Sequence, residues 1–507
     1  MDFLDSTLIP SPVLGILDTL GTNGYEGHIV GGCVRDLFLG REPKDWDITT
    51  DAEPEDVLRM FPDSFYENDF GTVGVKTEPF LPRGKAGREH DVVEVTTYRT
   101  ESDYSDRRRP DRVTFVTSLT EDLSRRDFTM NAIALSVRKS EKEGRREVDI
   151  VDPFHGRDDI GRKTIRTVGN PDQRFGEDAL RMMRAIRLFS ELRKDGALPD
   201  GDWTIETTTL AAIGKHSALL SHVSMERIRD EFSRIILSDS PADGVELLRT
   251  TGLLRQFLPE LEEGVGVAQN LHHRYEIYDH NIRSLRACRS DRLDVRLAAL
   301  FHDIGKTRTK RGSGYRATFH GHEHVGARMT RKILERLRFP KDITDRTSLL
   351  VDQHMFYYNV DEVTESSVRR LIRRVGLENM RDLIELRIAD RLGSGVPKAK
   401  PYKLRHLEYV IEKVSNDPVS VKMLAIGGND LQHELGLAPG PKIGAILDVL
   451  LSETIEDPSL NTKETLLRRS KELDKEALDT LRERAKEIIE DRRQSDDRKI
   501  RGRHRVS

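Results

Sequence analysis

The hydrophobic pattern of the chain changes at about residue 152, and this change limits the possible folds more than any other feature. Short β-like segments dominate before it, and a helical pattern follows to about residue 490. The turn-forming sequence Asp152-Pro153-Phe154-His155-Gly156 separates the two parts. The expected strands are His28–Val30, Asp45–Thr49, Gly74–Lys76, Val92–Tyr98, Arg112–Val116 and Arg146–Val151, with a helix over Glu53–Met60. We therefore predict an α+β protein, with an N-terminal α/β head followed by all-helical units.

The length of 507 residues exceeds one ordinary domain and predicts about three to four folding units. We expect a head over 1–151, a helical neck over 152–270, a histidine-rich helical unit over 271–400, a C-terminal helical unit over 401–490 and a disordered basic tail over 491–507. The net charge of −4 does not indicate nucleic-acid binding, so any basic surface must be local.

Cysteine content and hydropathy bear on the compartment. Only Cys33 and Cys288 occur, which argues against a disulfide framework or a cysteine zinc site and fits a reducing cytoplasm. No signal peptide opens the chain, and no apolar run approaches the roughly 20 residues of a membrane span. We expect a cytoplasmic protein that does not enter the membrane.

Glycines and carboxylates near the N-terminus indicate a site for a nucleotide and its metal. The pair Gly31-Gly32 lets backbone approach a phosphate closely. Asp45 and Asp47, two positions apart on an expected strand, point to one face and can hold one cation. Glu94, flanked by valines on another expected strand, supplies the third carboxylate that a two-metal site needs. The chain contains no P-loop motif, so this site must work without one.

Four ordered segments resemble motifs of the class II tRNA nucleotidyltransferase and bacterial poly(A) polymerase family. Residues 31–41 with 45–50 resemble motif A, 125–132 resemble the sugar- and triphosphate-binding motif B, 152–157 resemble the hinge between head and neck, and 177–187 resemble the base-reading motif D. The resemblance implies a nucleotidyltransferase head on a helical neck. It also implies Mg²⁺ as the cofactor, with CTP, ATP and tRNA as partners.

The resemblance assigns roles to individual residues. Asp45 and Asp47 would bind the metal with help from Glu94, and Gly32, Arg35 and Arg126 would contact the phosphates or sugar of the nucleotide. Asp178, Arg181, Arg184 and Arg187 would complete the nucleotide pocket. Arg35 beside Asp36 also fits a salt-bridged turn between a strand and a helix.

The motif D segment also carries information in its spacing. Asp178 lies one helical turn before Arg181, so we expect the carboxylate to orient the guanidinium, and such a pair presents acceptors and donors as a base edge does. Residues 103–110 resemble the loop that lets family members switch to adding the terminal A. This loop favours a complete CCA-adding enzyme or an A-adding one.

A second constellation follows the apolar run Leu297–Leu300. A helical sequence this rich in histidine and aspartate suits divalent metals that activate water. The series resembles the HD phosphohydrolase superfamily, which implies His280, His302, Asp303 and Asp390 on a first metal, His322 and His354 on a second, and Lys306 on phosphate. The identity of this metal stays open. His272, His273, His320 and His324 are expected to be bystanders.

These features lead to a ranked set of hypotheses. The first is a CCA-adding tRNA nucleotidyltransferase whose HD unit, over 271–400, acts as a phosphodiesterase or phosphatase on RNA ends. An A-adding enzyme or a poly(A) polymerase shares its chemistry. An HD phosphohydrolase with an RNA-binding head belongs to another class, as does a non-catalytic RNA-binding protein, which would be expected to lack the carboxylates of both sites.

Overall fold

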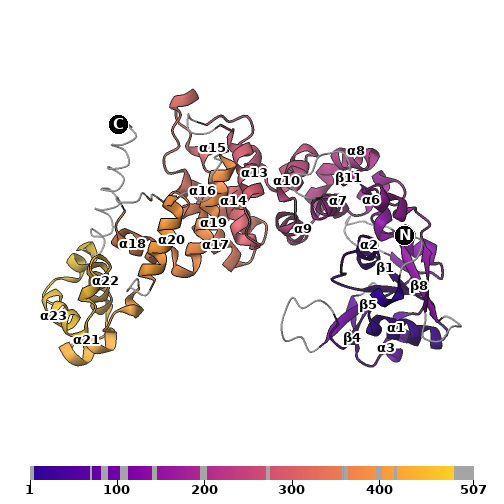
Figure 1. Cartoon of the computed structure of the whole chain (residues 1–507), viewed down its shortest axis with the longest axis horizontal. Helices are drawn as coiled ribbons and strands as arrows, with labels where there is room; N and C mark the ends of the chain where they lie inside the picture. The colour runs from indigo at the N-terminus through magenta and orange to yellow at the C-terminus, as the bar shows by residue number, and fades with distance from the viewer. Residues whose placement is uncertain are drawn as a thin grey trace.

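The computed structural model describes residues 5–68, 71–80, 90–102, 112–139, 146–193, 202–269, 274–356, 358, 363–395, 402–415 and 420–484. The loop predicted at 103–110, the tail at 491–507, and His272 and His273 lie outside these ranges. Figure 1 shows an elongated molecule, with a sheet-containing head at one end and helices through the rest of the chain. The predicted fold class is confirmed.

The head is built on one mixed sheet in the strand order β3-β4-β5-β2-β1-β8-β9. Its strands are β1 (Gly27–Val30), β2 (Asp47–Thr50), β3 (Ser64–Asn68), β4 (Thr72–Thr77), β5 (Asp91–Thr97), β8 (Ala134–Lys139) and β9 (Arg146–Val151). A two-stranded sheet pairs β6 (Arg99–Ser102) with β7 (Arg112–Phe115), and a second joins β10 (Thr164–Ile165) to β11 (Thr204–Ile205). Strands β3, β6, β8, β10 and β11 were not expected from the sequence, and β2 begins at Asp47 rather than Asp45.

One face of the main sheet forms the core of the head. Val73, Val75, Val93 and Val95 are buried on this face, whereas the residues between them turn to the other side. Helices of the head are α1 (Ser11–Thr22), α2 (Gly32–Phe38), α3 (Pro54–Met60) and α4 (Leu119–Ser124). In α1, a proline near the start and buried residues at helical spacing produce a helix that packs on β1. The opposite face of the sheet stays open for a site.

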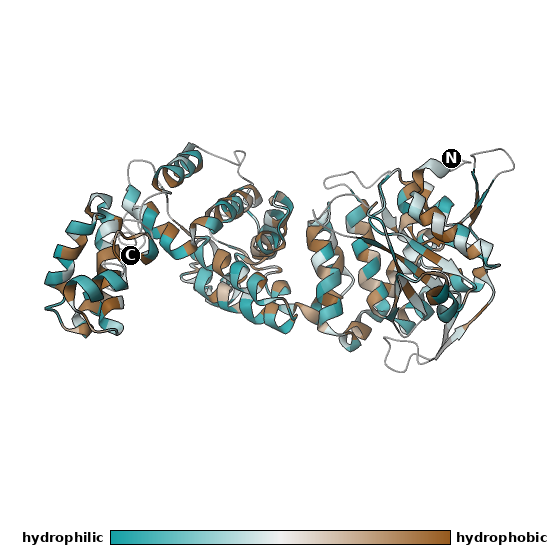
Figure 2. Cartoon of the chain, turned by 90° about the horizontal axis from the view of Figure 1, so that it is seen from below, coloured by the Kyte–Doolittle hydropathy of each residue, from teal (hydrophilic) through white to brown (hydrophobic). Residues whose placement is uncertain are grey.

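Helices account for most of the remaining chain. Between the head and residue 415 these helices are α5 (Gly156–Gly161), α6 (Pro171–Glu177), α7 (Leu180–Leu192), α8 (Thr207–His216), α9 (Met225–Leu237), α10 (Pro241–Thr250), α11 (Leu254–Phe257), α12 (Pro259–Glu262), α13 (Ile277–Ala287), α14 (Leu293–Phe301), α15 (Lys306–Thr309), α16 (His322–Arg336), α17 (Lys341–Gln353), α18 (Glu365–Val375), α19 (Leu377–Gly393) and α20 (Tyr402–Val414). Brown and teal residues alternate along these helices in Figure 2, as amphipathic packing requires.

Packing between helices joins the neck to the histidine-rich region. Helix α10 packs on α13, and α9 packs on α14. The guanidinium of Arg296, on α14, donates to the backbone carbonyls of Ile236 and Ser238 at 2.8 Å each. These two carbonyls lie at the C-terminal end of α9, where the helix itself offers no donor. One side chain therefore completes the hydrogen bonding of a helix in the neighbouring unit.

The C-terminal helices have a core of their own. They are α21 (Gly428–Leu435), α22 (Pro441–Glu456) and α23 (Lys463–Leu473), and their buried residues form a cluster separate from the main core. Arg369, on α18, joins the two parts by donating to the carbonyl of Ile455 at 2.7 Å. Among the described helices, none is both long and apolar enough to cross a membrane.

Candidate active site and a second metal centre

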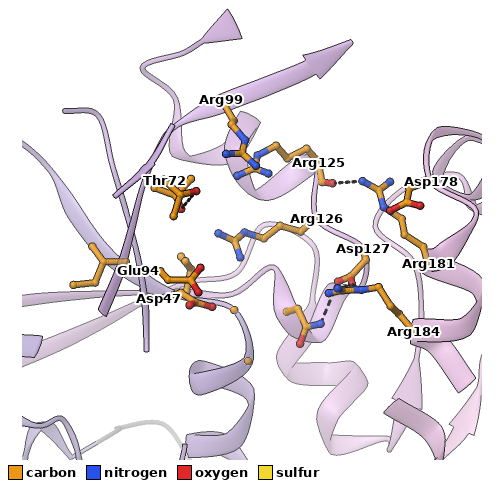
Figure 3. A pocket seen from close by; sticks show the side chains of 16 residues that line it. Asp47, Thr72, Glu94, Arg99, Arg125, Arg126, Asp127, Asp178, Arg181 and Arg184 are labelled. Carbon is orange, nitrogen blue, oxygen red and sulfur yellow. Dashed lines mark hydrogen bonds and ion pairs between the residues drawn. The ribbon is translucent and has the colours of Figure 1, made fainter. Parts of the chain in front are cut away.

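A cavity of about 490 Å³ lies on the open face of the head sheet and reaches the neck. Its lining is Val30, Gly31, Gly32, Asp47, Ile48, Thr72, Glu94, Thr96, Arg99, Arg125, Arg126, Asp127, Asn131, Asp178, Arg181 and Arg184. Figure 3 shows Asp47 and Glu94 at one end and Asp178, Arg181 and Arg184 at the other, with Arg126 between them. A single space thus joins acidic groups of the sheet to basic groups of the neck.

Parallel pairing of β2 with β5 places Asp47 directly beside Glu94. Burial raises the pKa of Asp47 to about 6, and the charge of Asp45 adds to the shift. Burial likewise raises the pKa of Glu94 to about 7, with a further contribution from Asp47. Carboxylates that repel each other in a cavity can bind a divalent cation, because the positive charge of the ion removes the repulsion.

Asp45 and Glu67 extend this acidic group. Asp45 lies in the bend before β2 rather than on the strand, and it is exposed. Its charge still raises the pKa values of Asp47 and Glu94, as does the charge of Glu67 on β3. Sequence reasoning missed Glu67, because no spacing relates it to Asp47 and because β3 was not expected.

Gly31, the first residue of the glycine pair, lets the backbone pass close to the carboxylate of Asp47. Gly31 has a φ of +85°, and a Cβ there would lie 2.9 Å from Oδ2 of Asp47. A side chain at Gly31 would therefore push the carboxylate away, and the positive φ favours glycine independently. The backbone turns into α2 at this point.

Asp122, on α4, holds two arginines of the cavity wall. Its carboxylate is fully buried. Oδ1 accepts from Nε of Arg125 at 2.9 Å, and Oδ2 accepts from Nη2 of Arg126 at 3.4 Å and from the hydroxyl of Thr49 at 3.1 Å. Burial alone would raise the pKa of Asp122, but the two guanidinium groups outweigh it and lower the value. Sequence reasoning missed this residue, although an acid three and four positions before paired arginines was an available signal.

The predicted pairing of Asp178 with Arg181 is wrong. A break at Asp178, which has extended backbone, separates α6 from α7, so residues 177–187 are not one helix. Asp178 instead accepts from Nη2 of Arg227 at 2.7 Å and from the backbone N–H of Leu180 at 3.0 Å. Arg181 donates to Glu177 at 2.5 Å and to the carbonyl of Arg125 at 3.2 Å. Both side chains still line the cavity, each held by a different partner.

Arg184 lines the cavity, whereas Arg187 points elsewhere. Arg184 donates to the buried carboxylate of Asp127 at 2.7 Å. Burial alone would raise the pKa of Asp127, but the Arg184 charge and the Asn131 hydrogen bond outweigh it and lower the value. Arg187 donates to Glu231 at 2.7 Å and to Glu191 at 3.0 Å.

Three of the residues predicted to bind the nucleotide or its metal lie outside the cavity wall. The cavity wall, as far as the structure describes it, does not include Arg35, Asp45 or Arg187. Arg35 donates to Asp36 at 2.8 Å and to Asn131 at 3.0 Å, which matches the salt-bridged turn weighed above. The cavity brings together the other predicted residues, which are Gly32, Asp47, Glu94, Arg126, Asp178, Arg181 and Arg184.

The second constellation converges on Asp303, which follows α14. We call the set His280, His302, Asp303, His322, His354 and Asp390 the HD centre, and all six residues are buried. Oδ2 of Asp303 lies 3.3 Å from Nε2 of His280 and 3.4 Å from Nε2 of His302. Its Oδ1 lies 3.2 Å from Nε2 of His322 and 3.7 Å from Nε2 of His354.

These contacts form two overlapping donor groups that share Asp303. His280, His302 and Asp303 make one, and Asp303, His322 and His354 make the other, each with ligand atoms within 4.8 Å of one another. Nε2 of His322 and Nε2 of His354 are buried and face Oδ1 of Asp303, but neither makes a well-aligned hydrogen bond. Buried polar atoms normally find a partner, and imidazole nitrogens beside a carboxylate suit a divalent metal. Asp390 lies next to the first group, with Oδ1 3.2 Å from His280.

Lys306 neutralises the carboxylate at the middle of the HD centre. Its ammonium donates to Asp303 at 2.6 Å and to Gln269 at 2.8 Å, and the expected role toward phosphate stays a prediction. Burial would raise the pKa of Asp303, but Lys306 and His302 outweigh it and hold the pKa well below its usual range. Burial lowers the pKa of His354 to about 4. Of the expected bystanders, His320 is exposed and His324 pairs with Asp352 at 2.6 Å.

Comparisons with known proteins agree with this geometry. Family models match the poly(A) polymerase head domain over residues 27–166, the RNA- and SrmB-binding site of polymerase A over 202–264, the HD domain over 247–393 and domain 2 of tRNA nucleotidyltransferase over 324–469. These matches cover the HD centre and the part of the cavity that the head contributes, whereas Asp178, Arg181 and Arg184 lie between the first two matches.

Named relatives are CCA-adding enzymes. The chain is 43% identical to the CCA-adding enzyme of Geobacillus kaustophilus over 249 residues, which are 49% of this chain and 54% of the relative. It is 41% identical to the CCA-adding enzyme of Limosilactobacillus reuteri over 253 residues, 50% of this chain and 55% of the relative. The matches thus span about half the length of these curated relatives.

A solved structure matches over a longer range. The crystal structure of the Bacillus stearothermophilus CCA-adding enzyme in complex with CTP is 30% identical, with a TM-score of 0.65, over 92% of this chain and 100% of that one. A relative at this identity that is matched over its full length shares ancestry as well as fold. The chain therefore belongs to the tRNA nucleotidyltransferase and poly(A) polymerase family.

Proposed function

We propose that the chain adds CMP and AMP from CTP and ATP to the 3′ end of tRNA without a nucleic-acid template. The observation that carries this proposal is the single cavity that joins Asp47 and Glu94 to the wall of Arg126, Asp178 and Arg184. One end suits phosphoryl transfer, and the other offers donors and acceptors to a base. The relatives named CCA-adding enzymes support the same activity.

The acidic end of the cavity is the reaction centre in this proposal. Asp45 and Asp47, with Glu94 assisting, would hold Mg²⁺, which supplies positive charge that lowers the pKa of a hydroxyl and shields a triphosphate. Burial raises the pKa values of Asp47 and Glu94, and the neighbouring carboxylates add to the shift, so a cation that binds here is favoured. The tRNA 3′-hydroxyl attacks the α-phosphate, a P–O bond forms, and pyrophosphate leaves.

The basic end binds and selects the nucleotide. Arg126 faces the carboxylates across the cavity and binds the triphosphate, in an orientation fixed by Asp122. Asp178 and Arg184 present an acceptor and donors to the base, and Arg227 and Asp127 hold them in place. Fixed side chains lose little entropy when a base binds, so protein groups can replace a template strand.

An incorporation assay tests this proposal. Purified protein is incubated with Mg²⁺, with tRNA that lacks CCA or ends in CC, and with CTP, ATP or both. Addition of C, C and A to the first tRNA supports the full activity, whereas addition of A alone supports an A-adding enzyme. Long A tracts would support a poly(A) polymerase, and no incorporation on any tRNA would contradict all three.

We also propose that the HD centre is a divalent-metal phosphohydrolase that acts on RNA ends. The overlapping donor groups around Asp303 support it, because two such groups can hold metal and activate water. Release of phosphate from RNA with a 2′,3′-cyclic or 3′-terminal phosphate, measured with Mg²⁺, Mn²⁺, Ni²⁺ or Co²⁺, tests it. Activity that persists in an Asp303→Asn variant would contradict this assignment.

The larger organisation remains part of the proposal. Head, neck, HD unit and C-terminal unit would divide at about residues 151, 270 and 400, as the sequence pattern predicts. The tRNA would lie along the neck and the C-terminal helices, and the protein would work in the cytoplasm. Limited proteolysis at these boundaries checks the division.

A further inference from the structure

A row of residues crosses the head sheet on the face that carries the carboxylates. Asp47 pairs with Glu94, Glu94 with Gly74, and Gly74 with Phe65, so the row runs over β2, β5, β4 and β3. Paired residues on neighbouring strands point to the same face. The row therefore continues the acidic end of the cavity toward the edge of the sheet.

Phe65 lies on this face because Gly74 leaves room for its ring. A Cβ at position 74 would lie 2.6 Å from Cζ of Phe65, and two further ring atoms would be within 3.1 Å. Only glycine lets the aromatic ring cover β4 and extend toward Glu94. Phe65 is 39% exposed, so one face of the ring meets solvent.

A cation accompanies the ring. Nζ of Lys76, on β4, lies 5.9 Å from the centroid of the Phe65 ring. Lys76 is two residues beyond Gly74, so it shares the same face, and it is exposed. An aromatic surface beside a lysine is the combination that stacks a base and contacts its phosphate.

The place of the ring fits the second substrate. Arg126 lies beside Gly31, where a Cβ would be 3.4 Å from its Nη1, and so marks the β1 side of the carboxylates. Phe65 lies on the β3 side, at the opposite end of the row. In phosphoryl transfer the attacking and leaving oxygens lie roughly in line on opposite sides of the phosphorus. With the triphosphate on the Arg126 side, the attacking hydroxyl comes from the Phe65 side.

We propose that the Phe65 ring stacks the 3′-terminal base of the acceptor RNA and that Lys76 contacts the adjoining phosphate. Two strand spacings of about 4.8 Å place the Phe65 backbone roughly 10 Å from that of Glu94. Stacking tolerates every base, so one platform serves an RNA end whose last nucleotide changes with each addition. This inference rests on the proposed nucleotidyltransferase activity and names its acceptor site.

Phe65→Leu is the decisive variant, since leucine keeps apolar cover over Gly74 but cannot stack a base. We expect the KM for acceptor tRNA to rise roughly tenfold, the size of one lost stacking contact. The KM for CTP stays the same, because CTP binds at the other end of the cavity. Phe65→Trp restores the KM for tRNA. Tyr66→Leu is the matched control, since Tyr66 adjoins Phe65 on β3, points to the other face and is similarly exposed at 43%.

A binding measurement separates this inference from the proposed function. An acceptor RNA that ends in 2-aminopurine loses fluorescence when its last base stacks on the ring of Phe65, and Phe65→Leu abolishes the loss. Quenching in the wild type that persists in Phe65→Leu would overturn the inference, as would an unchanged KM for tRNA. If the wild type incorporates no nucleotide on any acceptor, the proposed function fails, whatever the fluorescence shows.

Discussion

The carboxylates of the head face an open cavity and repel one another, whereas Asp303 in the HD centre is enclosed and paired with the positive charge of Lys306. In the head, burial and mutual repulsion raise the pKa values of Asp47 and Glu94. In the HD centre, Lys306 and His302 hold the pKa of Asp303 well below its usual range. The two centres use the same acidic chemistry with opposite electrostatic balance.

This difference separates roles in binding from roles in stability. Repelling carboxylates cost the native head some stability and gain it back only when a cation binds. The buried contacts of Asp303 already stabilise the HD unit without metal, and a metal that binds there must compete with Lys306 for the carboxylate. Substitution should therefore harm activity in the head and folding in the HD unit.

The largest expected effect is on catalysis in the head. Asp47→Asn should lower CMP incorporation about 10³-fold, which corresponds to the loss of about 4 kcal/mol of transition-state stabilisation. Its unfolding midpoint should not fall, because one repelling charge is removed. Incorporation of labelled CTP and a thermal melt check both statements. A variant that melts well below the wild type would break the comparison.

The next effect is on folding of the HD unit. Asp303→Asn should lower the free energy of unfolding by about 3 kcal/mol, because it breaks a buried pair with Lys306. Urea unfolding followed by far-ultraviolet circular dichroism measures this loss of stability. His324→Ala removes a surface contact with Asp352 in the same unit and should cost less than about 1 kcal/mol. Equal stability of Asp303→Asn and the wild type would contradict the enclosed charge balance.

A smaller effect tests how the basic wall of the cavity is held. Asp122→Asn should raise the KM for CTP and the KM for ATP together, roughly tenfold, since it loses the charge that fixes Arg125 and Arg126. Glu121→Gln, on the exposed side of the same helix, should leave both values unchanged. A rise for one nucleotide alone would mean that Asp122 acts on base selection instead of triphosphate binding.

The smallest effect concerns pH. The pKa of Asp127 is lower in the native state than in the unfolded chain, so its ionisation stabilises the native state above the ordinary value of about 3.9. This contribution is lost as the pH falls below that value. The stability advantage of the wild type over Asp127→Asn should shrink by about 1 kcal/mol between pH 6 and pH 3. Urea titrations at both pH values measure it, and a constant difference would contradict the shift.

Sequence reasoning succeeded where a repeating pattern fixes geometry. The valines on both sides of Glu94 predict a strand that places Glu94 on the open face of the sheet. The pairing of this strand with β2 places Glu94 beside Asp47. It failed for β8, because Ala134–Lys139 continues an apolar run that fits a helix or a strand equally. Only its pairing with β1, far away in the sequence, selects the strand.

The neck shows a second kind of failure. Each residue turns an α-helix by about 100°, so the six residues from Arg181 to Arg187 fall roughly 120° short of two full turns. Arg187 therefore faces Glu231 instead of the cavity. The break at Asp178 had a signal in its side chain, which accepts from the backbone N–H of Leu180 as helix-starting aspartates do. Its partner Arg227 had none, because tertiary packing alone joins α9 to α7.

The contact between Arg296 and the C-terminal end of α9 limits where the chain can be truncated to give a stable fragment. A fragment that stops before α13 loses the guanidinium that serves the carbonyls of Ile236 and Ser238, and it uncovers the apolar sides of α9 and α10 that α14 and α13 protect. A fragment meant to isolate the head and neck should keep residues up to Phe301, or replace the exposed apolar positions of both neck helices with polar ones.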